Sequence, residues 1–194
     1  GALNNSGTLL ASRNLSATAN SISNSGLIQA NERLALLAND SIHNTQGGVI
    51  NGQNVSAIAL TGDISNERSI SQQKRSGTGY SQLTSVLDNA ARIEAGNDLS
   101  LSASGDIRNI GGVIRADGNA ELSAEGDVII ASAAEQQAML RQDKRHYWEQ
   151  SSTTQHASEV QLGNDLSINA GGTLSLIAST LKASGDINLA ADGN

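Results

Sequence analysis

The sequence has 194 residues but no cysteine, no proline and no phenylalanine, and only one tryptophan and two tyrosines. The absence of cysteine excludes disulfide bonds, thiolate catalysis and cysteine metal sites, and leaves the redox compartment open. The absence of proline leaves every backbone N–H free for sheet ladders. Because aromatic side chains normally fill thick globular cores, we expect a narrow core of Leu, Ile, Val and Ala instead.

Charge and hydropathy exclude further classes of protein. The net charge is −7 at pH 7 and there is no basic stripe, so nucleic acid is not an expected partner. No run approaches the roughly 18 apolar residues of a membrane span, and no signal peptide is recognisable. Leu3 and Asn5 occupy the positions that Ile22 and Asn24 occupy one repeat later. We therefore expect the chain to be a segment cut from a longer array.

A repeat of 21 residues governs the middle of the chain, where Ile93 corresponds to Ile114 and Leu101 to Leu122. Within each repeat apolar residues alternate with polar ones, which is the pattern of half-buried strands and not of helices. Gly-Asn and Gly-Asp pairs suited to tight turns separate the strands. This pattern predicts an all-β fold, a right-handed parallel β-helix in which each repeat of about 20 residues forms one coil.

Two files of equivalent apolar residues set the coil register, and they indicate a single domain over residues 1–194 with about seven to nine coils. The first file is Leu9, Ile28, Ile50, Ile93, Ile114, Val160 and Leu181, and the second is Leu15, Leu34, Val55, Leu99, Ala120, Leu166 and Ile187. Two spacings in the first file, 43 and 46 residues, are too long for one coil. They predict inserts at about residues 67–90 and 133–159, each either a degenerate coil or an excursion from the stem.

The motif Ile-x-Asn recurs at one position of the coil. It ends at Asn24, Asn44, Asn66 and Asn109. Stacked amides can hydrogen-bond along a solenoid axis, so the motif predicts an asparagine ladder. The alternative is that Asn is simply a common turn residue.

The two inserts resemble each other, because Tyr80 precedes Ile93 by the same 13 residues that separate Tyr147 from Val160. We expect β-hairpins that leave the stem at the same corner and touch, burying Tyr147 or Trp148. Residues 76–79 would form the first turn, whereas the helix formers in residues 134–150 leave a short helix as an alternative there. The inserts also hold the partner-binding candidates Lys74, Arg75, Tyr80, Lys144, Arg145, Tyr147 and Trp148. Exposed aromatics beside cations are common in recognition surfaces, although these residues could equally pack the inserts together.

No catalytic, cofactor-binding or metal-binding residue is expected. Four of the acids, Asp63, Asp106, Asp127 and Asp186, follow glycine in repeated turns, and turn chemistry explains them. His43, His146 and His156 lack ligand spacing, and His43 should point outward. There is neither a nucleophile elbow, nor a complete dinucleotide loop, nor a calcium-binding nonapeptide repeat.

The units that begin at Gly96 and Gly163, together with the run RHYWEQSSTTQHASEV at residues 145–160, resemble the haemagglutinin repeats of filamentous haemagglutinin-like exoproteins, which include contact-dependent growth inhibition proteins. The resemblance covers nearly the whole chain. It implies a β-helical filament, secretion by a partner outer-membrane transporter of a Gram-negative bacterium, and adhesion or toxin delivery at a target-cell surface. Cargo and receptor do not follow from it.

The expected function is therefore that of a stalk segment, not an enzyme and without cofactors, in a secreted adhesin or toxin-delivery filament at the bacterial cell surface. The alternative is a carbohydrate-active β-helix that binds or cleaves polysaccharide. A cut-out segment would expose unpaired coil ends, so we also expect it to self-associate end to end.

Overall fold

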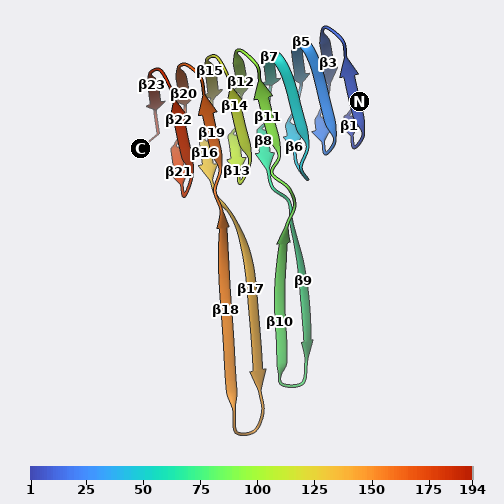
Figure 1. Cartoon of the computed structure of the whole chain (residues 1–194), viewed down its shortest axis with the longest axis vertical. Helices are drawn as coiled ribbons and strands as arrows, with labels where there is room; N and C mark the ends of the chain where they lie inside the picture. Colours follow the sequence, from blue (N-terminus) through green and yellow to red (C-terminus); the bar gives the residue numbers. More distant parts are fainter. Residues whose placement is uncertain (194) are drawn as a thin grey trace.

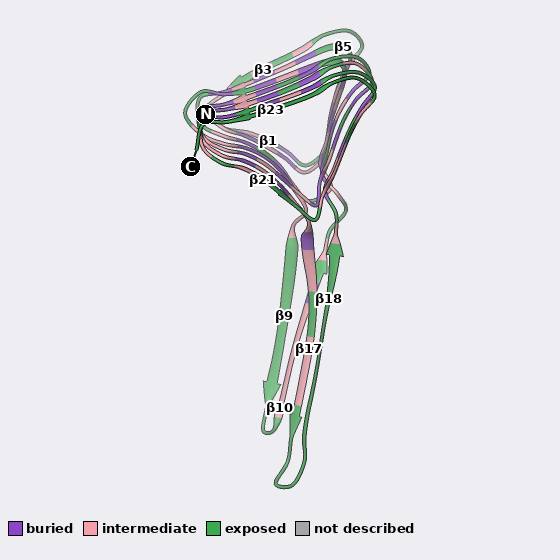
Figure 2. Ribbon diagram, turned by 90° about the vertical axis from the view of Figure 1, so that its left-hand side faces the viewer, coloured by how far each residue is buried: buried purple, intermediate pink, exposed green. Residues whose placement is uncertain are grey.

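The computed structural model describes residues 1–193, which form 23 strands and no helix, and hence contain no helix that could cross a membrane. Most strands wind into a parallel β-helix whose coils have three sides (Figures 1 and 2). The first side is a seven-stranded parallel sheet, so the stem has seven coils. Its strands are β1 (Leu3–Asn5), β4 (Ile22–Asn24), β6 (Ile42–Asn44), β8 (Ile64–Glu67), β13 (Ile107–Ile110), β16 (Val128–Ala131) and β21 (Leu174–Ile177).

The other two sides belong to one continuous twelve-stranded sheet. The second side of the coil comprises β2 (Thr8–Ala11), the first half of β5 (Leu27–Ala38), the first half of β7 (Val49–Ala59), β11 (Arg92–Ala95), β14 (Val113–Ala116), β19 (Glu159–Leu162) and β22 (Thr180–Ala183). The third side comprises β3 (Leu15–Ala19), the second halves of β5 and β7, β12 (Leu99–Ala103), β15 (Ala120–Ala124), β20 (Leu166–Ala170) and β23 (Ile187–Ala191).

Strand pairing confirms both apolar files along their whole length. Ile50 pairs with Ile93 and Ile114 pairs with Val160, so each long spacing is one coil step plus an excursion. The second file pairs in the same unbroken way, from Leu15 to Ile187. In the middle coils these side chains are buried in an aliphatic core without any aromatic residue. The scarcity of aromatics thus reflects a shaft too narrow for them.

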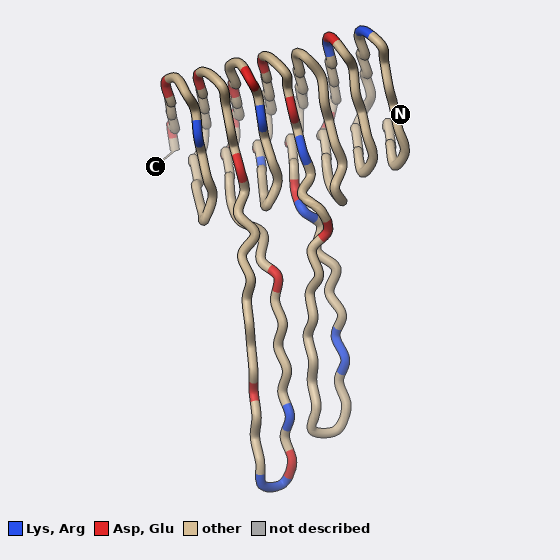
Figure 3. The backbone as a smooth tube through the Cα atoms, viewed as in Figure 1, with Lys and Arg blue, Asp and Glu red and all other residues tan. Residues whose placement is uncertain are grey.

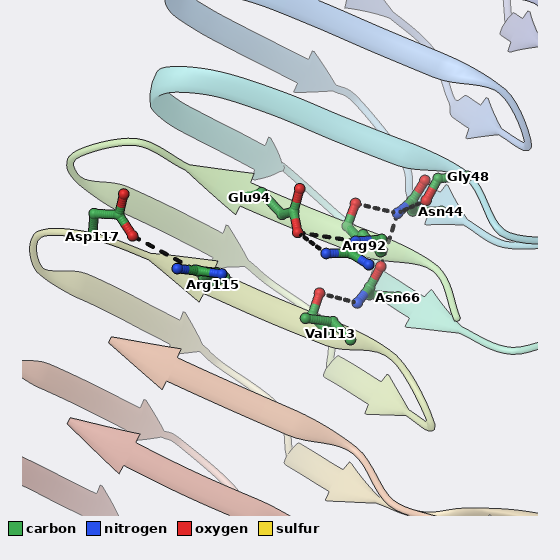
Figure 4. A network of polar contacts seen from close by, with 8 residues as sticks. All are labelled: Asn44, Gly48, Asn66, Arg92, Glu94, Val113, Arg115 and Asp117. Carbon is green, nitrogen blue, oxygen red and sulfur yellow. Dashed lines mark hydrogen bonds and ion pairs between the residues drawn. The ribbon is translucent and has the colours of Figure 1, made fainter. Parts of the chain in front are cut away.

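The predicted asparagine ladder is present. Each Nδ2 donates to the Oδ1 of the next rung at 2.7–2.8 Å, in the order Asn5, Asn24, Asn44, Asn66 and Asn109. Nδ2 of Asn44 also donates to the carbonyls of Gly48 and Arg92 (Figure 4). The ladder ends because the next coil places the buried Ile130 beside Asn109.

The turn aspartates serve a second axial network. Oδ1 of Asp63 accepts the backbone N–H of Asp106 at 2.8 Å, and Oδ1 of Asp106 accepts that of Asp127 at the same distance. Asp127 accepts the N–H of Thr173 in turn. The first three Gly-Asp turns therefore share a structural role, because each of their carboxylates bonds the backbone of the next coil. His43 lies outward as expected, with Nδ1 2.8 Å from the Ser65 hydroxyl.

The corner between the first and second sides is tight. Beside the ladder, a Cβ on Gly112 would lie 2.5 Å from Oδ1 of Asn109 and 2.6 Å from Nδ2 of Asn66. Gly111 has a φ of +61°, which favours glycine. Both excursions leave the stem at this corner.

Candidate partner interface

The two excursions are β-hairpins, as expected, and neither contains a helix. The first consists of β9 (Ile70–Gly77) and β10 (Tyr80–Leu87), and the second of β17 (Ala133–Gln142) and β18 (Tyr147–His156). The first turn is Thr78–Gly79 alone, since residues 76 and 77 lie in the strand, and Gly79 has a φ of +70°. The predicted four-residue turn was therefore too long.

The hairpins pair with each other in the antiparallel order β18-β17-β10-β9, which we call the lateral sheet. It projects from one side of the stem (Figures 1 and 2). The roots follow β8 and β16, two coils apart, or about 10 Å at the usual spacing. Each hairpin adds two strands, which occupy about the same distance, so the rise of the stem matches the width of a hairpin.

Polar contacts fix the roots of the hairpins. The hydroxyl of Ser85, which is 1% exposed, bonds the backbone of Gln136 and so joins the two hairpins. Arg68 donates to the carbonyls of Gly111 and Asp88 at 2.8 and 2.9 Å. Below the second hairpin, the buried Ser158 hydroxyl donates to the Asn109 carbonyl at 2.8 Å.

The aromatic residues do not bury one another, which corrects the expectation that contact would cover Tyr147 or Trp148. Their exposed fractions are 62% and 46%. The hairpins meet instead through the β10–β17 ladder, and consecutive residues of a strand point to opposite faces. Tyr147 and Trp148 therefore lie on different faces of a single-layered sheet.

One face carries a row of three large side chains near the tip. Arg141 on β17 lies opposite Tyr80 on β10 and opposite Trp148 on β18. This order places a guanidinium between two aromatic side chains, an arrangement that favours cation–π contacts. Together with His146, the three line a shallow hollow of about 450 Å³. The same face carries Arg75.

The opposite face carries Lys74 and Tyr147. The Tyr147 hydroxyl donates to Oε2 of Glu149 at 2.6 Å, and this hydrogen bond to a carboxylate raises the pKa of Tyr147 above its ordinary value of 10.0. The predicted candidates thus divide between two faces and do not form one cluster.

The remaining candidates, Lys144 and Arg145, lie in the exposed turn at the tip of the second hairpin, where charged residues gather (Figure 3). Oδ1 of Asp143 accepts the backbone N–H groups of Arg145 and His146, both at 2.7 Å. These bonds lower the pKa of Asp143 below its ordinary value of 3.8. The aspartate therefore organises the turn that displays the two cations.

Sequence reasoning missed Arg141, whose place between Tyr80 and Trp148 depends on how the two hairpins pair. Counting alternate residues within the second insert would have put Arg141 opposite Trp148. It would not have brought in Tyr80, because that contact crosses between hairpins separated by two coils.

A groove of about 650 Å³ on the stem is a second concave surface, and its acids include Asp98, Glu121 and Asp165. Two of these carboxylates are already engaged. Oδ1 of Asp98 accepts the N–H of Asn119 at 3.0 Å, and that of Asp165 accepts the N–H of Asp186 at 2.8 Å. Within residues 1–193, no three His, Cys, Asp or Glu side chains gather as a metal site would require.

Comparison with known proteins places repeats over the whole chain. A family described as "Haemagglutinin repeat" matches residues 1–68, and a second, "Hemagglutinin repeat", matches residues 70–146 and 141–194. A curated relative, "tRNA nuclease CdiA" from Yersinia mollaretii, is 28% identical over 207 residues. The alignment covers 89% of this chain but 7% of that protein. No solved structure matches.

Proposed function

Because the chain belongs to the haemagglutinin-repeat family, we propose that it is a stalk module of a secreted bacterial surface protein, an adhesin or a contact-dependent toxin-delivery filament. The observation that carries the proposal is the continuous stacking of seven coils, in which core side chains and turn aspartates repeat a structural role. In this proposal the coils supply length, and the lateral sheet supplies a surface for contact with a target cell.

Secretion by a partner outer-membrane transporter of a Gram-negative bacterium is part of the same proposal, and its support is the family resemblance. The nuclease activity in the relative's name is not assigned to this chain, which spans 7% of that protein. We also propose that the chain is not an enzyme. Its support is that two of the stem-groove acids, Asp98 and Asp165, accept backbone N–H groups of neighbouring coils and so have a structural role.

The experiment compares two deletions in the parent protein, expressed on its own bacterium. The first removes residues 28–49, one coil of the stem, and joins Leu27 to Ile50, which reproduces an existing corner because Leu27 pairs with Val49. The second removes residues 136–153, most of the second hairpin. We expect both proteins to be secreted, because neither deletion interrupts the remaining stacked coils.

The coil deletion should shorten the filament by about 4.8 Å and leave attachment to target cells unchanged. The hairpin deletion should keep the β-sheet circular dichroism of the stem, lower its stability modestly and abolish attachment. Loss of attachment on the coil deletion, in a folded and secreted protein, would instead place a binding or catalytic site in the stem. Full attachment without the hairpin would remove the lateral sheet from the proposal.

A further inference from the structure

The lateral sheet has two free edges, β9 and β18, each with backbone groups that no strand within residues 1–193 satisfies. In an antiparallel ladder, alternate residues of an edge strand turn their N–H and C=O groups outward. Such an edge is a template for another strand, unless the sequence protects it. The two edges differ in that protection.

The outward residues follow from the hairpin turns. The N–H of Asp143 donates to the carbonyl of His146 at 2.9 Å, which makes this pair hydrogen-bonded and, by alternation, makes the even-numbered residues of β18 face β17. The outward residues of β18 are Tyr147, Glu149, Ser151, Thr153 and Gln155. In the first hairpin, the pair that closes the two-residue turn is Gly77 with Tyr80. The outward residues of β9 are therefore Ile70, Gln72, Lys74 and Ser76.

Lysine at an edge is a common protection against pairing, and Lys74 lies among the outward residues of β9 with Arg75 beside it. Over its ten residues β18 has no lysine, arginine or proline, and its single carboxylate belongs to Glu149. Its middle, residues 150–155, is an uncharged run of Gln, Ser and Thr whose side chains are exposed. The β18 edge has ten residues against eight in β9, is exposed, and carries no lysine or proline that would prevent pairing with another strand.

We propose that β18 is a docking edge for the β18 strand of a second copy of this chain, and that the two form a symmetric antiparallel pair. Outward residues must face outward residues, and the register that pairs all five of them places Ser151 opposite Ser151 of the second copy. Glu149 then faces Thr153 of the second copy, whereas a register centred on Glu149 would oppose two carboxylates. The two lateral sheets become one sheet of eight strands.

Antiparallel pairing at this edge keeps the two stems apart. In Figure 1, β18 starts at the far tip of the hairpin and ends at the stem. Antiparallel pairing therefore sends the two stems to opposite ends of the shared sheet. The symmetry closes the pair, so the product is a dimer and not a growing fibre. A contact of one strand with another is small, and the association is accordingly weak.

A disulfide test reports the register directly, because the chain has no cysteine of its own. In Ser151→Cys, the two introduced thiols would lie opposite each other at a Cα separation of about 5.5 Å, within the range of a disulfide. Mild oxidation should convert this variant to a covalent dimer on a non-reducing gel. The matched variant Gln72→Cys, on the outward side of β9, should remain largely monomeric. Equal cross-linking of the two would contradict the proposal.

Sedimentation of proline variants tests the same edge without a covalent bond. Ser151→Pro and Gln72→Pro each remove one outward N–H and spare the bonds to the inner strand. At protein concentrations up to about 1 mM, the unchanged chain and Gln72→Pro should approach twice the monomer mass of 19.9 kDa. The dimer dissociation constant of Ser151→Pro should be higher by about tenfold or more. Circular dichroism checks that all three are folded. Dimers in both variants would identify association through coil ends, and loss in both would identify β9–β18 pairing; either result overturns the proposal.

Discussion

The stem and the lateral sheet are both β-structure, yet they are stabilised in different ways. The stem is parallel, encloses an aliphatic shaft and hydrogen-bonds along its axis through asparagine and aspartate side chains. The lateral sheet is antiparallel and has one layer, and nearly all of β9 and β18 is exposed on both faces (Figure 2). At its roots Arg68 donates to the stem carbonyl of Gly111, and Ser85 joins the two hairpins.

The period of the sequence decides which of the two structures forms. A stem coil repeats every 19–22 residues, so its apolar side chains superimpose and exclude water. The hairpins are rich in Ser, Thr and Gln and bury little, so they gain less from the hydrophobic effect. What allows them to persist is that a stem step of two coils equals the width of one hairpin, which brings β10 and β17 into register. The stem thereby positions the two hairpins so that they pair into the lateral sheet.

The largest loss of stability should come from replacing a leucine of the stem by asparagine, and the same substitution in the lateral sheet should cost far less. Leu99→Asn places an amide without partners among the stacked aliphatic side chains of the stem, where Leu99 is 2% exposed. We expect it to lower the free energy of unfolding by about 3–5 kcal/mol. Leu83→Asn, in the half-buried middle of β10, should cost about 1 kcal/mol or less. Urea unfolding followed by circular dichroism measures both, and equal losses would mean that the lateral sheet has a core of its own.

A smaller effect should follow from breaking the asparagine ladder in its middle. Asn44→Ala removes the donor to the carbonyls of Gly48 and Arg92 and leaves Nδ2 of Asn24 without the Oδ1 that accepts from it. Buried groups without partners should cost about 2–3 kcal/mol in all. The control Asn51→Ala, on the half-exposed outer side of β7, should change stability by about 0.5 kcal/mol or less. A comparable loss in the control would show that the ladder adds nothing specific.

Much of the stem could be predicted from the sequence, because a solenoid repeats its local environment. The offsets of Ile93 and Leu99 to their neighbours identified the strand register, and Ile-x-Asn identified the ladder. The site was less predictable, because Arg141 gains its aromatic neighbours only when two hairpins two coils apart pair in one register. The alternation of residues within one hairpin does not reveal how two hairpins pair with each other.

The smallest expected effect lies at the tip of the second hairpin, the part of the lateral sheet farthest from the stem. Asp143 accepts two backbone N–H groups there, and these lower its pKa in the folded chain relative to the unfolded one. A depressed carboxyl pKa means that the ionised form stabilises the turn. This contribution is complete above the ordinary pKa of 3.8 and is lost as the pH falls through the lower folded value.

Trp148, the single tryptophan of the chain, reports on this turn from five residues away. We expect its fluorescence to change on acidification with a midpoint below 3.8, while the stem keeps its circular dichroism. The variant Asp143→Asn should lack this transition and should show a more mobile tip already at neutral pH, because a neutral amide oxygen accepts the two N–H groups less strongly. A transition that persists unchanged in the variant would assign it to another carboxylate, such as Glu149. Loss of stem structure over the same pH range would show that the tip and the stem do not respond independently.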